Sequence, residues 1–245
     1  MPADPAKLAR RRLLGGLPIL ALAAASGPAR ADAPGLAVTC DTTLGPALRK
    51  VGAAYKARSG VPVFVFPTGP GLILPQLTRD IQNDILVTQV SILVQAAQAG
   101  IVAAVPERPS WHNPLVIAGR RGADPTSGAF AATDPSPASD IDGPAVLARL
   151  GLQPASVLGA IDTDEVAFLL TSGVAQSGLL HMTDLRAAPS LDAVRPVPPE
   201  IQPPFVYAAS VTRLARRPHP ENLIAFLATP EAMTLLRDSG LEIPA

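Results

Sequence analysis

Short apolar runs and stretches of helical periodicity alternate along the first half of the chain. Leu36–Cys40 is an apolar run that ends in polar residues, as in a buried strand. From Leu44 to Ser59 the apolar residues recur at helical spacing, and Gly60 is placed to cap the helix C-terminus. The alternation continues with strands expected at 61–66 and 84–87 and helices expected at 72–82 and 92–99. This order predicts a parallel α/β layout.

A second α/β series begins at Leu115, before a polar segment at 120–139 that is rich in Pro, Gly and Ser. Asp162 and Glu165 have the spacing of a capping box for a helix that stops at Gly173. Thr229 and Pro230 are placed as N-cap and first residue of the last helix. The pattern predicts strands at 115–118, 157–160, 178–181 and 205–211, helices at 144–150 and 162–172, an extended stretch at 194–204 and two C-terminal helices.

Two α/β lobes fit this repeated pattern better than one continuous sheet. We expect lobe 1 to comprise residues 32–114 plus 210–245 and lobe 2 to comprise residues 115–209. Two crossover strands, near Leu115–Ala118 and Phe205–Ala209, would form the hinge.

The sequence opens with a basic cluster, an apolar stretch and a run of small residues. Arg10, Arg11 and Arg12 precede 13 mostly apolar residues, and Ala29–Ala31 reads Ala-Arg-Ala. This order predicts an export signal over residues 1–31, so we expect a periplasmic protein. The apolar stretch is shorter than the roughly 20 residues of a bilayer span, so no membrane anchor is expected. The arginines fit a Sec signal and a twin-arginine signal equally well.

Composition excludes some classes of function. Hydrophobic residues make up 48 % of the chain and charged residues 16 %, which is typical of a folded globule. The formal net charge is zero and no basic face is visible, which argues against nucleic-acid binding. The single cysteine, Cys40, excludes an internal disulfide and is interpreted as a small apolar side chain in a buried strand. We expect a monomer without a bound cofactor.

The chain has few residues typical of catalytic or metal sites. Its three histidines are far apart, and metalloprotease, C-x-x-C, G-x-S-x-G and P-loop motifs are absent from the sequence. No cluster of ligand residues predicts a metal site. An exported enzyme would need a convergent acid–base set, for which Asp41, His181 and Glu165 are the candidates. Separations beyond about 10 Å between these side chains would exclude that hypothesis.

Polar loops follow two of the predicted strands, each directly before a helix. Asp41-Thr42-Thr43 follows the first strand and Thr68-Gly69-Pro70-Gly71 follows the second. Ligands of α/β sheets bind at these carboxyl ends, where hydroxyls and the backbone N–H groups of helix starts attract anions. Thr43 is also interpreted as a plain N-cap, and one hydroxyl can serve both roles.

These loops and the C-terminal blocks resemble the periplasmic molybdate-binding proteins, a branch of the type II periplasmic binding proteins. The resemblance extends from about Val38 to Gly240 and implies a two-lobed α/β fold, each lobe a mainly parallel sheet flanked by helices, with the ligand cleft between them. It also implies closure on the ligand and delivery to the permease of an ABC transporter. Four blocks carry it: Val38–Leu44, Phe66–Leu72, His112–Val116, and Pro203–Tyr207 with the Pro-Glu helix starts at Pro220 and Pro230.

The resemblance implies that a small oxyanion, molybdate or tungstate, is held by hydroxyls and backbone N–H groups. Thr43 and the pair Thr68–Gly69 stand at the two serine loops of the family, and Tyr207 stands at its ligand tyrosine. Tyr207 is alternatively an aromatic plug between the lobes. The implied ligand-binding residues are Thr42, Thr43, Thr68, Gly69, Ser139, Leu180 and Tyr207.

Two residues depart from the family's pattern. Pro70 removes one backbone N–H from the second loop, and Asp41 places a carboxylate beside the first. Either Asp41 points away from the cleft, or the ligand is not a simple oxyanion and carries an amine, a hydroxyl or a metal ion, because like charges at about 4 Å repel by several kcal/mol. The alternatives are a same-fold binding protein for another small ligand, serving a transporter or a sensor, and an exported lyase.

Overall fold

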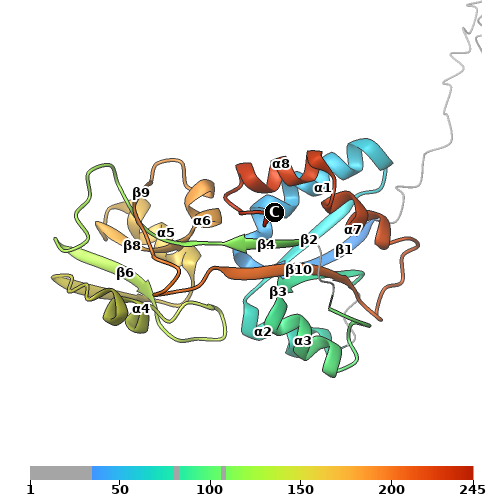
Figure 1. The fold of residues 1–245 in the computed structure, drawn as a ribbon, viewed down its shortest axis with the longest axis horizontal. Coiled ribbons are helices and arrows are strands. Elements are labelled where there is room, and N and C mark those ends of the chain that lie inside the picture. Colours follow the sequence, from blue (N-terminus) through green and yellow to red (C-terminus); the bar gives the residue numbers. More distant parts are fainter. Residues whose placement is uncertain (1–34, 80–82, 106–108, 245) are drawn as a thin grey trace, which may run out of the picture. The chain divides into compact units, whose positions relative to one another are not determined.

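The computed structural model describes residues 35–79, 83–105 and 109–244, so the predicted export signal at 1–31 lies outside the described residues. Within this part of the chain, ten strands form two sheets of five, and helices flank each sheet (Figure 1). The expected two-lobed α/β fold class is confirmed. In the same part of the chain, no helix has the length and apolar character that crossing a bilayer requires.

The first sheet is built mainly from the N-terminal part of the chain. β1 pairs in parallel with both β2 and β3, whereas β10 runs antiparallel to β3 and β4. β10 is therefore the strand that opposes the common direction. Across the sheet the strands are β2 (Val63–Thr68), β1 (Leu36–Asp41), β3 (Ile85–Gln89), β10 (Phe205–Val211) and β4 (Ser110–Asn113).

The second sheet repeats this arrangement. β6 pairs in parallel with β7 and β8, and β5 runs antiparallel to β8 and β9. Across the sheet the strands are β7 (Ser156–Ala160), β6 (Ala129–Thr133), β8 (Ser177–His181), β5 (Leu115–Gly119) and β9 (Asp192–Pro196).

Helices cover both faces of each sheet because each sheet is apolar on both sides. On the first sheet, α1, α7 and α8 pack into one hydrophobic cluster, and α2 and α3 pack into another. On the second sheet, α5 and α6 share one cluster, and α4 packs into the other. The helices are η1 (Thr42–Leu44), α1 (Gly45–Ser59), α2 (Pro70–Leu77), α3 (Val90–Gln98), α4 (Gly143–Leu150), α5 (Thr163–Ser172), α6 (Met182–Ala187), α7 (Glu221–Leu227) and α8 (Pro230–Asp238).

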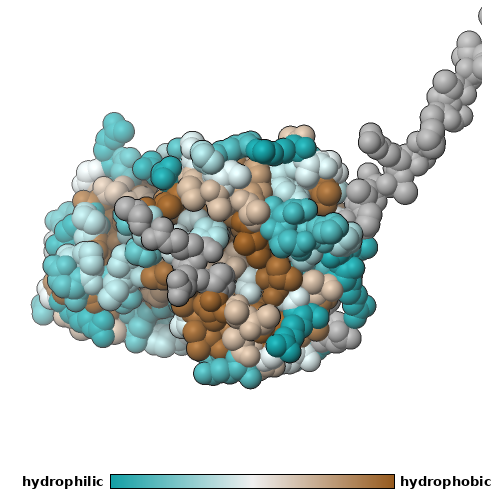
Figure 2. Space-filling view, turned by 45° about the vertical axis from the view of Figure 1, so that its right-hand side comes forward, coloured by the Kyte–Doolittle hydropathy of each residue, from teal (hydrophilic) through white to brown (hydrophobic). Residues whose placement is uncertain are grey.

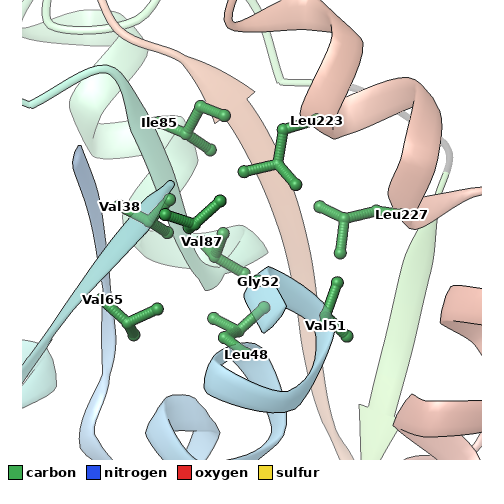
Figure 3. Close-up of a pocket in the computed structure, with 10 residues that line it drawn as sticks. Val38, Leu48, Val51, Gly52, Val65, Ile85, Val87, Leu223 and Leu227 are labelled. Atoms are coloured by element: carbon green, nitrogen blue, oxygen red, sulfur yellow. The ribbon is translucent and has the colours of Figure 1, made fainter. Parts of the chain in front are cut away.

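Figure 3 shows the core between the first sheet and the helices α1 and α7. Strand residues and helix residues point into a void of about 10 Å³. The lining side chains are hydrocarbon, so the void lacks the polar groups that orient a ligand, and we assign it to the core. Cys40 is fully buried in the same cluster, as the sequence indicated. The labelled residues are Val38, Leu48, Val51, Gly52, Val65, Ile85, Val87, Leu223 and Leu227.

The chain crosses between the sheets twice. The first crossing is at Pro114, between β4 and β5, and the second is the segment 197–204 between β9 and β10. β10 pairs with β3 and β4 from Phe205 to Val211, so residues 205–209 belong to the first sheet and not to lobe 2, where we had expected them. The hinge residues expected at 115–118 and 205–209 accordingly lie inside strands, and the crossings lie just before them.

Other predicted elements differ in detail. The polar segment 120–139 contains a strand, β6, whose sequence AFAAT has little polar alternation because four of its five residues are buried. The helix expected at 72–82 begins at Pro70, a first-turn position that needs no N–H donor, and ends at Leu77. In the capping box of α5, the Asp162 carboxylate accepts from the N–H of Glu165, but the Glu165 carboxylate accepts from Ile161 and not from Asp162.

Apolar side chains also reach the surface. Figure 2 shows apolar residues gathered toward the middle of one face, between hydrophilic areas. Phe64 and Phe66 belong to the edge strand β2, and Val157 belongs to the edge strand β7. The large exposed apolar side chains of the described residues are Phe64, Phe66, Leu72, Val94, Val157, Ile161, Phe168 and Val174.

Candidate functional site

A small polar cavity of about 10 Å³ lies where the carboxyl ends of strands from both sheets meet. This volume holds about one water molecule. Asp41 ends β1 and His181 ends β8, and the loop before α4 contributes Asp140. The position agrees with the rule that α/β sheets bind ligands outside the carboxyl ends of their strands. The lining residues are Asp41, Thr42, Thr43, Pro70, Ala138, Ser139, Asp140, Thr163 and His181.

Asp140 joins the two sheets through its carboxylate. Its Oδ1 lies 2.9 Å from Nε2 of His181, at the end of β8. Its Oδ2 accepts hydrogen bonds from the Gln89 side-chain amide at 2.6 Å and from the Tyr207 hydroxyl at 3.1 Å, and both donors belong to the first sheet. One carboxylate of lobe 2 thus collects donors from β3, β8 and β10.

Asp140 and His181 form a buried ion pair. Burial acts to raise the pKa of Asp140, but the His181 imidazolium outweighs it and holds that pKa below its ordinary value. Burial likewise acts to lower the pKa of His181, but the Asp140 carboxylate outweighs it and raises that pKa. Removing one partner of such a buried pair typically destabilises a protein by about 3–5 kcal/mol. The ring of His181 is further fixed by an edge contact with Phe205, with centroids 4.9 Å apart.

Asp41 is the second buried carboxylate of the cavity, and only half of it is satisfied. Its Oδ1 accepts a hydrogen bond from the Thr88 hydroxyl at 2.7 Å. Its Oδ2 is buried without a hydrogen-bond partner. Burial, with the neighbouring Asp140 carboxylate, raises the pKa of Asp41 to about 7, despite the lowering effects of Thr88, His181 and Gln89. Asp41 therefore changes charge near neutral pH, and a strongly shifted pKa in a cleft is a mark of functional sites.

Thr43 takes part in a second contact between the sheets. Its hydroxyl donates to Oδ1 of Asp184 at 2.8 Å and lies 2.6 Å from the hydroxyl of Thr183, both at the start of α6. Asn113, the last residue of β4, donates to the Thr183 hydroxyl at 2.9 Å. The hydroxyl of Thr43 is thus already hydrogen-bonded within the protein.

Three of the expected ligand-binding residues line the cavity. These are Thr42, Thr43 and Ser139. The Ser139 hydroxyl accepts a hydrogen bond from the N–H of Ile141 at 3.1 Å, which fixes the loop before α4. Of these three, Thr43 already donates its hydroxyl hydrogen within the protein, whereas the Ser139 hydroxyl only accepts a hydrogen bond.

The other four expected residues lie outside the cavity lining. Thr68 donates its hydroxyl to Gln76 at 3.0 Å, and Leu180 is buried in the core of the second sheet. Gly69 packs against the loop before α4, where a Cβ would lie 2.7 Å from Cα of Ala138. Tyr207 is fully buried, and its hydroxyl donates a hydrogen bond to Asp140, which lines the cavity.

Two of the three candidate acid–base residues line the cavity and the third does not. Asp41 and His181 line one cavity, whereas Glu165 accepts a hydrogen bond from the N–H of Ile161 at 2.8 Å and only caps α5. Asp140 is the functional residue that sequence reasoning missed. The sequence held one signal, because Asp140-Ile141-Asp142 precedes a helix. Asp142 is the N-cap, with its Oδ1 3.0 Å from the backbone N of Ala145, so capping does not account for Asp140. Among the described residues, no group of three or more Asp, Glu, His or Cys could hold a metal ion.

Comparison with known proteins assigns the family. The profile described as "Bacterial extracellular solute-binding protein" matches residues 36–242, which is most of the chain. The chain belongs to this family. The assignment agrees with the two sheets and with the polar cavity between their strand ends. A family defined as extracellular also places this solute-binding protein outside the cytoplasm.

One curated relative of this solute-binding protein has an enzyme's name. It is the aconitate isomerase of Pseudomonas sp, 26 % identical over 267 aligned positions, which cover 94 % of this chain and 98 % of the relative.

Solved structures show the same fold at low identity. The periplasmic molybdate-binding protein of Azotobacter vinelandii is 15 % identical with a TM-score of 0.71, and the match covers 86 % of this chain and 100 % of that one. AfuA of Actinobacillus pleuropneumoniae, with fructose-6-phosphate bound, is 15 % identical with a TM-score of 0.62, and the match covers 84 % of this chain and 83 % of that one. These likenesses establish the fold and leave the ligand open.

Proposed function

We propose that this chain is a periplasmic binding protein that serves an ABC transporter and holds a small solute through a hydrogen bond from the solute to Asp41. One observation carries the proposal: Asp41 lines the cavity, and its Oδ2 is buried without a hydrogen-bond partner. A buried acceptor without a partner costs about 1–3 kcal/mol. A solute with an ammonium or hydroxyl group removes this cost and so favours the closed form.

A simple oxyanion fits this cavity less well. Asp41 and Asp140 both line it, and only His181 balances them with a positive charge. The hydroxyl of Thr43, which the resemblance assigned to an oxyanion, already donates its hydrogen to Asp184. Molybdate or tungstate would therefore meet at least one uncompensated carboxylate whenever Asp41 is ionised. These anions are the competing assignment, supported by the fold likeness.

Solute entry requires the two lobes to separate, because the closed cavity has space for about one water molecule. Closure then follows if the solute binds the closed form more tightly than the open form. We infer that the closed, monomeric protein is the form that docks on the permease.

The test is calorimetric titration of the purified protein at pH 6 and pH 8. The probes are molybdate and tungstate as oxyanions, and ethanolamine, L-alanine and L-lactate as donor-bearing solutes. A donor-bearing solute should bind several-fold more tightly at pH 8, because Asp41, with a pKa of about 7, is mostly ionised there. An oxyanion should bind more tightly at pH 6.

The variant Asp41→Asn should change the affinities of the two kinds of solute in opposite directions. The amide carries no charge, so a donor-bearing solute should lose about tenfold or more in affinity, the value of a hydrogen bond to a charged group. An oxyanion should gain affinity. Asp142→Asn is the matched control. Residue 142 does not line the cavity, and asparagine keeps the side-chain oxygen that caps α4. Binding of molybdate alone, strengthened by Asp41→Asn, would overturn the proposal in favour of oxyanion transport.

A second candidate is an exported enzyme that moves a proton on a small carboxylic acid. Two observations favour it: the pKa of Asp41 lies near neutrality, where general acid–base groups work best, and an aconitate isomerase matches nearly the whole chain. Asp41 would take a proton from a carbon next to a carboxylate. It would then return the proton to another carbon of the same unsaturated system, so that atoms and charge balance.

This second function predicts exchange of carbon-bound hydrogen with solvent. Aconitate incubated with the protein in D₂O should gain deuterium, followed by proton NMR, and its cis and trans forms should interconvert. Asp41→Asn should abolish both signals, whereas Asp142→Asn should retain them. Wild-type protein that leaves aconitate unchanged after long incubation would exclude aconitate as a substrate.

A further inference from the structure

Three hydrogen-bond donors converge on the side chain of Asp140. They are the Gln89 amide at 2.6 Å, the Tyr207 hydroxyl at 3.1 Å and Nε2 of His181 at 2.9 Å. Gln89 and Tyr207 are neighbours in the first sheet, where β3 pairs with β10, and His181 ends a strand of the second. Each donor is held by a strand, so their arrangement does not depend on the loop that carries Asp140.

Such a set of donors is what a small carboxylate requires. Two neutral donors and one imidazolium surround the two oxygens, and the imidazolium balances one negative charge. Two of the donors are buried and Gln89 is half-buried, so bulk water competes weakly for the set: Tyr207 is fully buried and His181 is 1 % exposed. Asp140 reaches this position from a loop that also contacts the first sheet through a hydrogen bond from the N–H of Gly71 to the carbonyl of Pro137.

We propose that Asp140 is a tethered counter-ligand, a carboxylate of the chain that occupies a binding site for small carboxylates. The inference rests on the proposed function in one respect, that solutes bind in this cleft. Asp41 and Asp140 line the same cavity. A hydroxy acid or amino acid could therefore direct its hydroxyl or ammonium to Asp41 and its carboxylate to the donors that Asp140 otherwise engages. Asp140 then selects against solutes that cannot displace it.

The experiment removes the tethered carboxylate and supplies a free one. Asp140→Ala is heated in increasing formate, and its thermal midpoint is compared with that in chloride of equal ionic strength. Formate should raise the midpoint of Asp140→Ala in a saturable way, because it replaces the lost partner of His181. Wild type and Asp142→Ala, a variant of the same loop whose lost carboxylate capped α4, should respond to formate no more than to chloride.

A second variant tests whether formate binds to the three donors. Adding Tyr207→Phe to Asp140→Ala removes one hydrogen bond, so the half-saturating formate concentration should rise about tenfold. If Asp140→Ala does not fold, Asp140→Ser offers a smaller side chain in the same position and the same readout. A folded variant whose midpoint formate does not raise beyond the wild-type response would overturn the proposal. An unchanged half-saturation after Tyr207→Phe would also overturn it, because formate would then bind elsewhere.

This result is separable from the proposed function. Formate rescue is measured without any natural solute and with Asp41 unchanged. If formate rescues Asp140→Ala while ethanolamine, L-alanine and L-lactate fail to bind wild type, the counter-ligand stands and the donor-solute proposal falls. The reverse pair of results overturns only the counter-ligand.

Discussion

At the scale of single residues, burial decides the chemistry of the cavity. Asp41 and Asp140 are two carboxylates of one cavity, but only Asp140 has a cationic partner in direct contact. The pKa of Asp140 therefore lies below its ordinary value, and that of Asp41 rises to about 7. Two carboxylates with separated pKa values can take different roles, one as a fixed charge and one as a proton carrier.

The raised pKa of Asp41 predicts a pH dependence of stability. Between pH 4 and pH 7 the folded chain holds a proton on Asp41 that the unfolded chain releases. The reason is that the pKa of Asp41 is about 7 in the folded chain and has its ordinary value of 3.8 in the unfolded chain. The stability that this proton gives is complete below pH 4 and is lost as pH rises to 7. Asp41→Asn has no carboxyl group at this position and so no such loss. The free energy of unfolding of Asp41→Asn minus that of wild type should therefore increase by about 4 kcal/mol from pH 4 to pH 8.

Urea unfolding at a series of pH values measures this difference. Asp142→Asn, which retains the cap of α4, is the control and should follow the wild-type curve. If the Asp41→Asn and wild-type curves run parallel across pH 4–8, the carboxyl of Asp41 is not the group that titrates near neutrality.

Residue-level prediction from the sequence was partial for a physical reason. Asp41 and His181 could be singled out because each follows an apolar strand at its carboxyl end. Asp140 was missed although it stands just before a helix, because its role comes from Gln89 and Tyr207, which lie 51 and 67 positions away along the chain. The hydroxyl of Thr43 was expected to face a ligand, but it donates a hydrogen bond to Asp184 on α6. Partners of this kind follow from tertiary packing, which periodicity does not encode.

At the scale of elements, short sequence signals predicted the helix ends, which depend on residues close together in the chain. The N-cap at Thr229 is confirmed by its hydrogen bond from the N–H of Ala232, and the C-cap at Gly60 by its left-handed backbone with φ of 76°. Strand β6 was missed because a strand buried on both faces shows no alternation. β10 was predicted as a strand, but its pairing with β3 and β4 is a long-range contact. The expected lobe boundary therefore assigned residues 205–209, five residues of the first sheet, to lobe 2.

At the scale of the whole molecule, closure depends on close approach between the two lobes. Gly69 precedes α2 in lobe 1, and a Cβ at this position would lie 2.7 Å from Cα of Ala138 in lobe 2. A backbone atom cannot move aside cheaply, so a methyl group here conflicts with the closed form while leaving each lobe's core untouched.

Gly69→Ala should therefore shift the protein toward an open form. Small-angle X-ray scattering without solute should give a larger radius of gyration than for wild type, and any solute that binds wild type should bind the variant more weakly. Gln98→Ala is the control, because it changes an exposed residue of α3 in lobe 1 and leaves the contact between Gly69 and Ala138 intact. An unchanged radius of gyration and affinity would show that the contact at Ala138 does not limit closure.

Cys40 gives the chain an internal reporter of such motions. It is the chain's one cysteine, it is fully buried next to Asp41, and burial holds the pKa of its thiol well above the ordinary value. An alkylating reagent can react only when β1 separates from the helices that cover it and the thiol reaches water. The rate of alkylation therefore counts openings of the first lobe, and separation of the two lobes as rigid bodies would leave that rate unchanged.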